Sequence, residues 1–116
     1  MGVSGAGNFE DDSALDQLGH FVQGIVDEIE SAIENESLEP DEDAGAWLPC
    51  QVEILTLLAK NFGATLPPAA TIEHWRDEYI CVWEEYIDEL EPDDDYRADR
   101  RSTLDRTFAE AIAATR

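Results

Sequence analysis

Two histidines and two cysteines are the side chains of this sequence best suited to hold a metal ion. They are His20, Cys50, His74 and Cys81. Tetrahedral zinc sites usually take their ligands from closely spaced pairs, and these four residues form no such pair. A di-iron site would need a glutamate three residues before each histidine, and neither histidine has one. The sequence therefore indicates no metal site. A ligand- or metal-binding module that brings His20 and His74 into one cleft stays an alternative.

Motifs for covalent or phosphate chemistry are also missing from the sequence. No nucleophile motif occurs, and the early glycines do not follow a strand as those of a phosphate-binding loop do. Adjacent carboxylates such as Glu84 and Glu85 point apart on a helix and are typical of a solvated face. The acidic stretch 91–99 lacks the central glycine of a calcium-binding EF-hand loop. The sequence therefore predicts no catalytic residue, no cofactor and no enzymatic activity.

The charge of the chain is its most unusual property. Among 116 residues there are 28 acidic and 7 basic side chains, which gives a formal net charge of −21. Such a chain is repelled by phosphate backbones and by anionic lipid, so direct binding to nucleic acid or to a membrane surface is not expected. Two interpretations remain open. The acidity either attracts a basic protein partner, or it keeps the surface solvated in salt.

The cellular location expected from the sequence is the cytoplasm. The chain does not begin with a basic region followed by an apolar run, and no apolar stretch approaches membrane-spanning length. Cysteines are normally reduced in that compartment. Cys50 and Cys81 both lie beside apolar positions, and we expect them to be small buried side chains rather than a disulfide.

The elements that would position any site are helices, and the segment 71–90 is expected to lie at their centre. Its large apolar residues recur at steps of three and four, which places them on one face of a helix. They are Ile72, Trp75, Tyr79, Val82, Trp83, Tyr86, Ile87 and Leu90. Thr71 is the expected N-cap, and Pro92 is expected to end the helix. Such an aromatic stripe is typical of a core.

Three further amphipathic segments predict an all-α, four-helix domain that spans residues 1–116. The four helices are expected at about 13–35, 43–62, 71–90 and 99–115, after an irregular glycine-containing segment at 1–11. In the first helix Phe21 widens the apolar stripe, and Ser13 is the expected cap. In the last helix Ser102 repeats that capping spacing. Pro49 either begins the second helix or lies within a longer helix from Asp43, and the apolar period favours the longer helix.

The beginning of the chain resembles a bacterial family known as domain of unknown function 4259. The matching residues are Met1, Gly2, Gly5, Gly7, Phe9, Asp12, Ala14 and Asp16. Members of that family open with Met-Gly-x-Trp-Gly-x-Gly-x-Phe, and this chain has Ser4 in place of the tryptophan. The resemblance covers about sixteen residues. It implies a small, mainly helical protein and transfers no catalytic residues.

The connectors between the helices carry the one functional indication in the sequence. Short connectors favour antiparallel neighbours, so four helices should run up, down, up and down. The first and third connectors, which are both acidic, then lie at the same end. The expected partner-binding residues are Glu39, Asp41, Glu42, Asp43, Asp93, Asp94 and Asp95. The hypothesis is a small acidic interaction protein, such as an inhibitor or immunity-type protein that covers the basic surface of a nuclease toxin.

Overall fold

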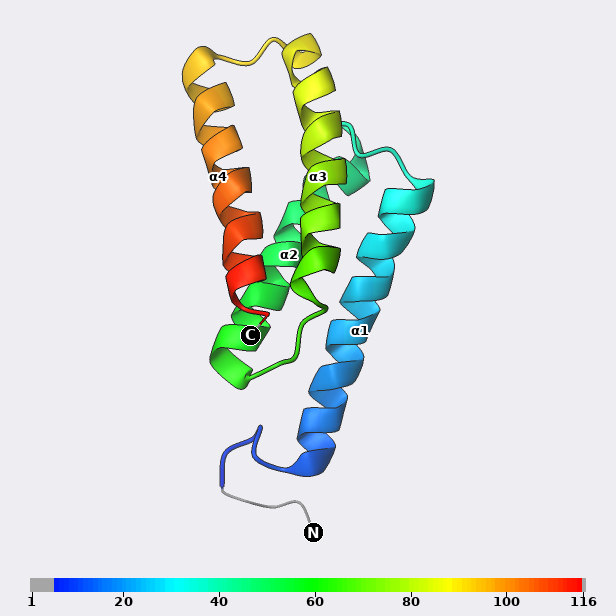
Figure 1. Cartoon of the computed structure of the whole chain (residues 1–116), viewed down its shortest axis with the longest axis vertical. Helices are drawn as coiled ribbons and strands as arrows, with labels where there is room; N and C mark the ends of the chain where they lie inside the picture. The colour runs from blue at the N-terminus through cyan, green and yellow to red at the C-terminus, as the bar shows by residue number, and fades with distance from the viewer. Residues whose placement is uncertain (1–5, 116) are drawn as a thin grey trace.

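The computed structural model describes residues 6–115, and within that range the chain forms an all-α, four-helix domain (Figure 1). The elements are α1 (Asp12–Asn35), α2 (Asp43–Phe62), α3 (Ala69–Tyr86), the short 3₁₀ helix η1 (Ile87–Leu90) and α4 (Asp94–Ala113). The helices run alternately up and down, as the short connectors predict. The fold class expected from the sequence is therefore confirmed.

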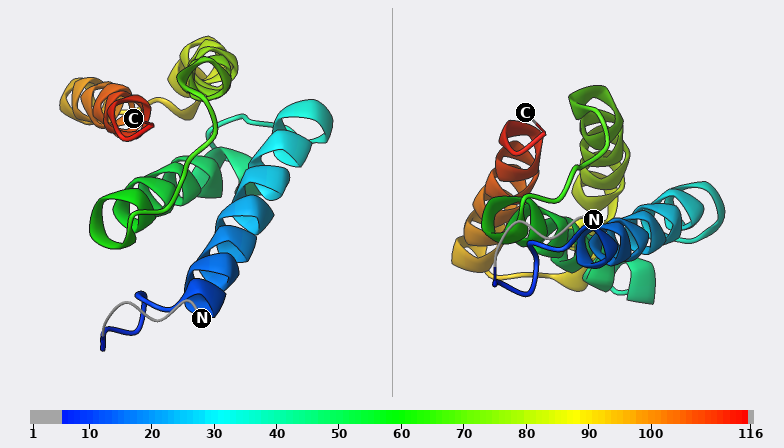
Figure 2. Two further views of the ribbon diagram at one scale, coloured as in Figure 1. Left: turned by 60° about the horizontal axis from the view of Figure 1, so that its bottom comes forward. Right: turned by 90° about the horizontal axis from the view of Figure 1, so that it is seen from below.

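The four helices pack as two pairs, and each helix contacts one or both helices of the other pair. α2 packs against α1 and α4, and α3 also packs against α1 and α4. Figure 2 shows α3 and α4 as one pair and α1 and α2 as the other. The molecule is elongated, with extents of 56 × 28 × 22 Å. No helix within residues 6–115 is long and apolar enough to cross a lipid bilayer.

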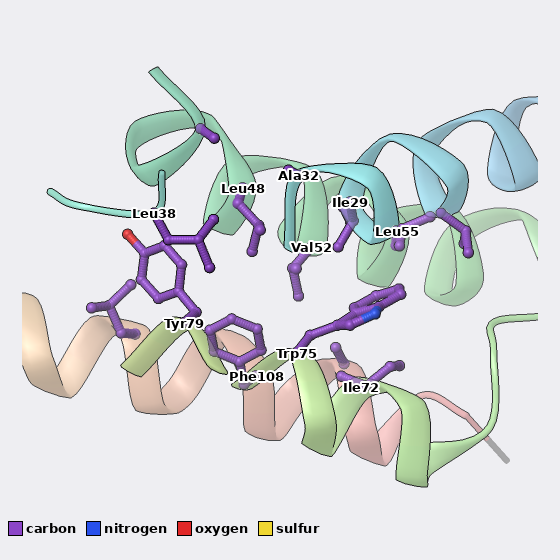
Figure 3. Close-up of a cluster of buried hydrophobic side chains, with 14 of the residues drawn as sticks. Ile29, Ala32, Leu38, Leu48, Val52, Leu55, Ile72, Trp75, Tyr79 and Phe108 are labelled. Carbon is purple, nitrogen blue, oxygen red and sulfur yellow. The ribbon is translucent and has the colours of Figure 1, made fainter. Parts of the chain in front are cut away.

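The aromatic face of α3 fills the centre of the core, as the sequence predicts. Trp75, Tyr79 and Trp83 are almost completely buried, and Figure 3 shows the first two beside Phe108 of α4. Aromatic side chains of this size bury about 150–250 Å² each and dominate the energetics of a core. The Trp75 indole N–H also donates a hydrogen bond of 3.2 Å to Glu30 of α1. The same helix therefore joins α1 and α4 to the core.

Pro49 lies inside α2, so the longer of the two alternatives for this helix is confirmed. A proline has no amide hydrogen, and the carbonyl four residues earlier therefore loses its helical partner. That carbonyl belongs to Gly45, and it accepts a hydrogen bond from the Tyr79 hydroxyl. A side chain on Gly45 would lie 2.0 Å from the Glu39 carbonyl oxygen. The proline, the glycine and the tyrosine thus form one packed unit.

Several helix boundaries differ from the sequence-based expectations. Asp11 caps α1 by accepting the Ser13 amide, so Ser13 is the donor and not the cap. α3 begins at Ala69 after Pro68, which places Thr71 inside the first turn. The α-helical part of α3 ends at Tyr86, and η1 continues it as far as Leu90.

α4 begins five residues earlier than expected, and Ser102 lies in its interior. The first two turns of this helix are rich in arginine and poor in apolar residues, so their apolar pattern is weak. Contacts from Arg97 and Arg101 to α3 stabilise these turns instead. Asp94 and Asp95 in the first turn add a favourable interaction with the helix dipole.

The expectation that the cysteines are buried is wrong. Cys50 and Cys81 are both exposed and unpaired with each other. Phe21 is also an exception, because it widens the apolar stripe of α1 in the sequence but is 63% exposed in the structure. Leu66 of the α2–α3 connector is buried against the core.

Candidate partner-binding site at the acidic end

The first and third connectors lie at the same end of the bundle, in the upper part of Figure 1. They also approach each other closely. Pro40 of the first connector lines the same surface hollow as Glu91 and Asp93 of the third connector and Tyr96 of α4. The hollow has a volume of about 420 Å³. Two acidic segments that are far apart in the sequence therefore contribute to one surface, which we call the acidic end.

Local contacts hold both connectors in place. In the first connector, Leu38 is buried in the core, and the Ser37 hydroxyl donates a hydrogen bond of 2.9 Å to the Glu39 carboxylate. Just before the third connector, Ile87 of η1 is buried, and the connector starts at Glu91, whose φ of 52° lies in the left-handed region. Leu38 and Ile87 point into the core, and the acidic residues of both connectors remain at the surface.

The seven residues expected to bind a partner are distributed over this acidic end. Glu39 is half-buried, and the other six are exposed: Asp41, Glu42, Asp43, Asp93, Asp94 and Asp95. Asp43 begins α2, and Asp94 and Asp95 lie in the first turn of α4. Helix starts stabilise negative charge, so Asp43, Asp94 and Asp95 cost the fold little at these positions.

The acidic end changes the ionisation of a tyrosine beside it. The negative charge of Glu85 and then that of Glu39 raise the pKa of the Tyr86 hydroxyl, with smaller contributions from burial and from Glu89. Glu39 belongs to the first connector, whereas Tyr86 ends α3. The larger effect therefore comes from the neighbouring Glu85 on α3 itself, and only the contribution of Glu39 reflects the approach of the first connector to the end of α3.

Two arginines neutralise part of the charge below the third connector. The Arg97 guanidinium contacts Glu84 at 3.0 Å and Asp88 at 2.8 Å, and it lies 5.4 Å from the centre of the Trp83 ring. Arg101 contacts Glu84 as well, and it contacts Asp105 at 3.0 Å.

This cluster was not found from the sequence. Its signal is present there, because Glu84 of α3 and Asp88 of η1 are four residues apart, as Arg97 and Arg101 are on α4. Burial alone would raise the pKa of the Glu84 carboxyl. The hydrogen bonds and charges of Arg101 and Arg97 outweigh that effect and hold the pKa below its ordinary value.

The structure does not bring the two histidines together. His20 is exposed on α1, in a hollow that it shares with Asp16, Gly19 and Gln23, whereas His74 is exposed on α3. Within residues 6–115 no three histidine, cysteine or acidic side chains are grouped so that they could hold a metal ion. The alternative of a ligand- or metal-binding module at these histidines therefore gains no support from the geometry.

These features define a class, an all-α bundle of four antiparallel helices with carboxylates gathered at one end. Comparison with known protein families, with curated protein sequences and with solved structures finds no match to this chain. The resemblance to domain of unknown function 4259 therefore stays a prediction. The part of that resemblance in residues 1–5 lies outside the described residues.

Proposed function

We propose that this chain is a small acidic protein-interaction module without enzymatic activity, whose acidic end covers a basic surface of a partner protein. An inhibitor or immunity-type protein directed at a nuclease toxin would act in this way. A nuclease must present positive charge to bind phosphate, so its active-site surface is a natural target for clustered carboxylates.

The observation that supports this proposal is the shared hollow at the acidic end. Leu90 and Tyr96 are 47% and 55% exposed beside it, which is unusual for large apolar side chains in so charged a region. They offer apolar and aromatic surface to the stem of a lysine or arginine, while Glu91 and Asp93 lie close enough to attract its charge. A surface of this kind can hold basic anchor residues of a partner. Solvation alone does not require exposed apolar side chains beside the carboxylates.

The proposal gives a role to the acids that no arginine neutralises. The ion pairs found within residues 6–115 involve none of the seven expected contact residues. Their charge is therefore available to a partner. Complementary charge of this kind speeds encounter and makes binding weaker as salt is added.

A matched pair of triple variants tests the proposal. One neutralises the acidic end with Asp41→Asn, Asp43→Asn and Asp94→Asn. The control removes the same charge elsewhere with Asp16→Asn, Glu53→Gln and Glu110→Gln. A basic protein captured from the source cells is purified, tested for nuclease activity, and titrated with both variants at low and high salt. We expect the first variant to bind more than about tenfold more weakly than the control.

The same titration also separates partner binding from general solvation. If the acidity acts only through total charge, both variants lose the same affinity, and the assignment of the acidic end as the contact surface is wrong. If the first variant also loses most of its salt dependence while the control keeps it, the charges that meet the partner lie at the acidic end.

A further inference from the structure

Pro49 divides α2 into two parts, and the first part carries acids of the acidic end. We call residues 43–48, which precede Pro49, the α2 start. This segment follows the first connector directly. Four of the seven expected contact residues lie in the α2 start or in that connector: Glu39, Asp41, Glu42 and Asp43. The positions of these four carboxylates therefore depend on the contacts that hold the α2 start.

The α2 start lacks two hydrogen bonds that usually hold the beginning of a helix. Its N-cap residue, Glu42, makes no side-chain capping bond, whereas Asp11 of α1 does. Pro49 has no amide hydrogen, so it cannot donate to the Gly45 carbonyl as another residue at this position would. Gly45 is buried, and a buried carbonyl without a donor destabilises the segment that carries it. The α2 start therefore depends on a donor from outside the helix.

The Tyr79 hydroxyl is this donor. Figure 3 shows the Tyr79 ring reaching from α3 toward the start of α2, where its hydroxyl donates a hydrogen bond to the Gly45 carbonyl. Tyr79 is 1% exposed, and its ring centre lies 6.0 Å from that of Phe108, so packing fixes the donor in place. Burial raises the pKa of the Tyr79 hydroxyl above its ordinary value of 10.0, and the positive charge of Arg100 opposes this rise only in part. The hydroxyl is therefore protonated at neutral pH.

Gly45 also contacts the first connector. A Cβ added to Gly45 would lie 2.0 Å from the Glu39 carbonyl oxygen and 2.8 Å from that of Leu38. The Glu42 amide donates a hydrogen bond of 2.9 Å to the same Glu39 carbonyl. The connector backbone is thus packed directly onto Gly45, so a movement of Gly45 also moves the connector. In this way the Tyr79 hydroxyl acts on carboxylates that it does not touch.

We infer that Tyr79 is a positioning residue of the acidic end. Its hydroxyl holds the Gly45 carbonyl and so keeps the α2 start and the acids of 39–43 in the arrangement that a basic partner binds. Repulsion among these acids favours opening of the α2 start, and the hydrogen bond opposes it. Only the role in partner binding rests on the proposed function, because opening of the α2 start can be measured without a partner.

Amide hydrogen exchange of the full-length protein tests the structural part of this inference. Tyr79→Phe removes the hydroxyl and keeps the ring. The Glu42 and Ala46 amides, which donate to the carbonyls of Glu39 and Glu42, should exchange more than about tenfold faster in this variant. Amides of 52–62, beyond Pro49, should change much less. Exchange that is no faster at the α2 start than in the rest of α2 would overturn the inference.

Thr56→Val is the matched control. The buried Thr56 hydroxyl donates a hydrogen bond of 3.2 Å to the Val52 carbonyl in the same helix, on the other side of Pro49. Its removal should leave the exchange of the Glu42 and Ala46 amides unchanged.

Pro49→Ala shows whether the effect passes through the Gly45 carbonyl. Alanine restores an amide that can donate to this carbonyl along the helix. In the Pro49→Ala background, Tyr79→Phe should therefore accelerate exchange at the α2 start only about threefold or less. This double variant also keeps the test open if Tyr79→Phe alone does not fold, which circular dichroism would show. The same large acceleration in both backgrounds would mean that the hydroxyl acts elsewhere, against the inference.

Titration of the captured basic protein tests the role in binding. Tyr79→Phe changes no charge, so it should raise the dissociation constant about two- to fivefold while the salt dependence of binding stays as in the wild type. Thr56→Val should bind as the wild type does. Unchanged affinity of Tyr79→Phe, despite faster exchange at the α2 start, would overturn the positioning role. Failure of the proposed function would show separately, as equal affinity of the two triple variants.

Discussion

Among the described glycines, Gly45 leaves the least room for a side chain. An added Cβ would lie 2.0 Å from the Glu39 carbonyl oxygen, which is part of the backbone and cannot rotate away. Gly45→Ala should therefore destabilise the protein by about 1–3 kcal/mol, the usual cost of overpacking. Chemical denaturation followed by circular dichroism measures this change.

Gly24 provides the control for that substitution. It lies in the exposed interior of α1, with nothing within 4 Å of an added Cβ. Gly24→Ala should stabilise the protein by roughly 0.5–1 kcal/mol, because alanine loses less backbone entropy in a helix. Equal stability of the two variants would show that the first connector does not approach Gly45 as closely as the structure indicates.

At the scale of single residues, the sequence predicts which side chains are buried better than it predicts their hydrogen-bond partners. The burial of Tyr79 follows from its place on the aromatic stripe of α3. Its hydrogen bond to Gly45 does not, because that bond depends on how α2 and α3 cross in space. Pro49 indicates in the sequence that the carbonyl four residues earlier needs a hydrogen-bond donor from elsewhere. It does not identify which side chain supplies that donor.

At the scale of helices, the ion-pair cluster that joins α3 to α4 gives a pH-dependent prediction. The pKa of Glu84 is lowered from its ordinary value of 4.5, because Arg101 and Arg97 together outweigh the opposing effect of burial. The stabilisation is therefore complete above pH 4.5 and is lost as the pH falls through the lower pKa of the folded state. The pair is partly exposed, so its contribution should be at most about 1 kcal/mol.

Glu84→Gln should accordingly be less stable than the wild type at neutral pH, and the difference should disappear in acid. Thermal melts over a pH series measure it. Glu85→Gln is the matched control, because the adjacent Glu85 is exposed and makes no ion pair within residues 6–115. A stability difference for Glu84→Gln that stays constant down to strongly acidic pH would argue against the ion pairs.

The sequence predicts helices well where an apolar face specifies them. The second helix was placed at 43–62, as observed, and the aromatic helix was placed within a few residues. The start of α4 was placed too late because its first turns are held by charges on α3, and these are tertiary contacts. A pattern read along one helix cannot reveal a partner on another.

At the scale of the whole molecule, the sequence predicts the acidic end but not the apolar groove between α1 and α2 that Phe9, Phe21 and Ile54 line. The end follows from short connectors and alternating helix direction, which bring the first and third connectors together. The groove depends on where α1 separates from α2. Phe21 has the spacing of a core residue, and only the three-dimensional arrangement of the helices shows that α2 does not cover it.

The uneven distribution of charge leads to a final prediction about salt. A chain with a net charge of −21 repels itself, so its stability should rise as added salt shortens the Debye length to about 3 Å at 1 M. Glu34 lies in the last turn of α1, where the helix dipole disfavours an anion, and close to the first connector. Glu34→Gln should therefore stabilise the protein by about 0.3–1 kcal/mol at low salt.

Glu53→Gln is the comparison, because Glu53 is the only acid in residues 51–72 and has little negative charge near it along the chain. Thermal melts of both variants at low and high salt separate the two accounts of the acidity. If the charge is concentrated at one end, Glu34→Gln gains more than Glu53→Gln at low salt, and screening removes the difference. Equal gains at both positions would mean that repulsion is spread evenly over the surface, and general solvation would then explain the acidity better than a partner surface.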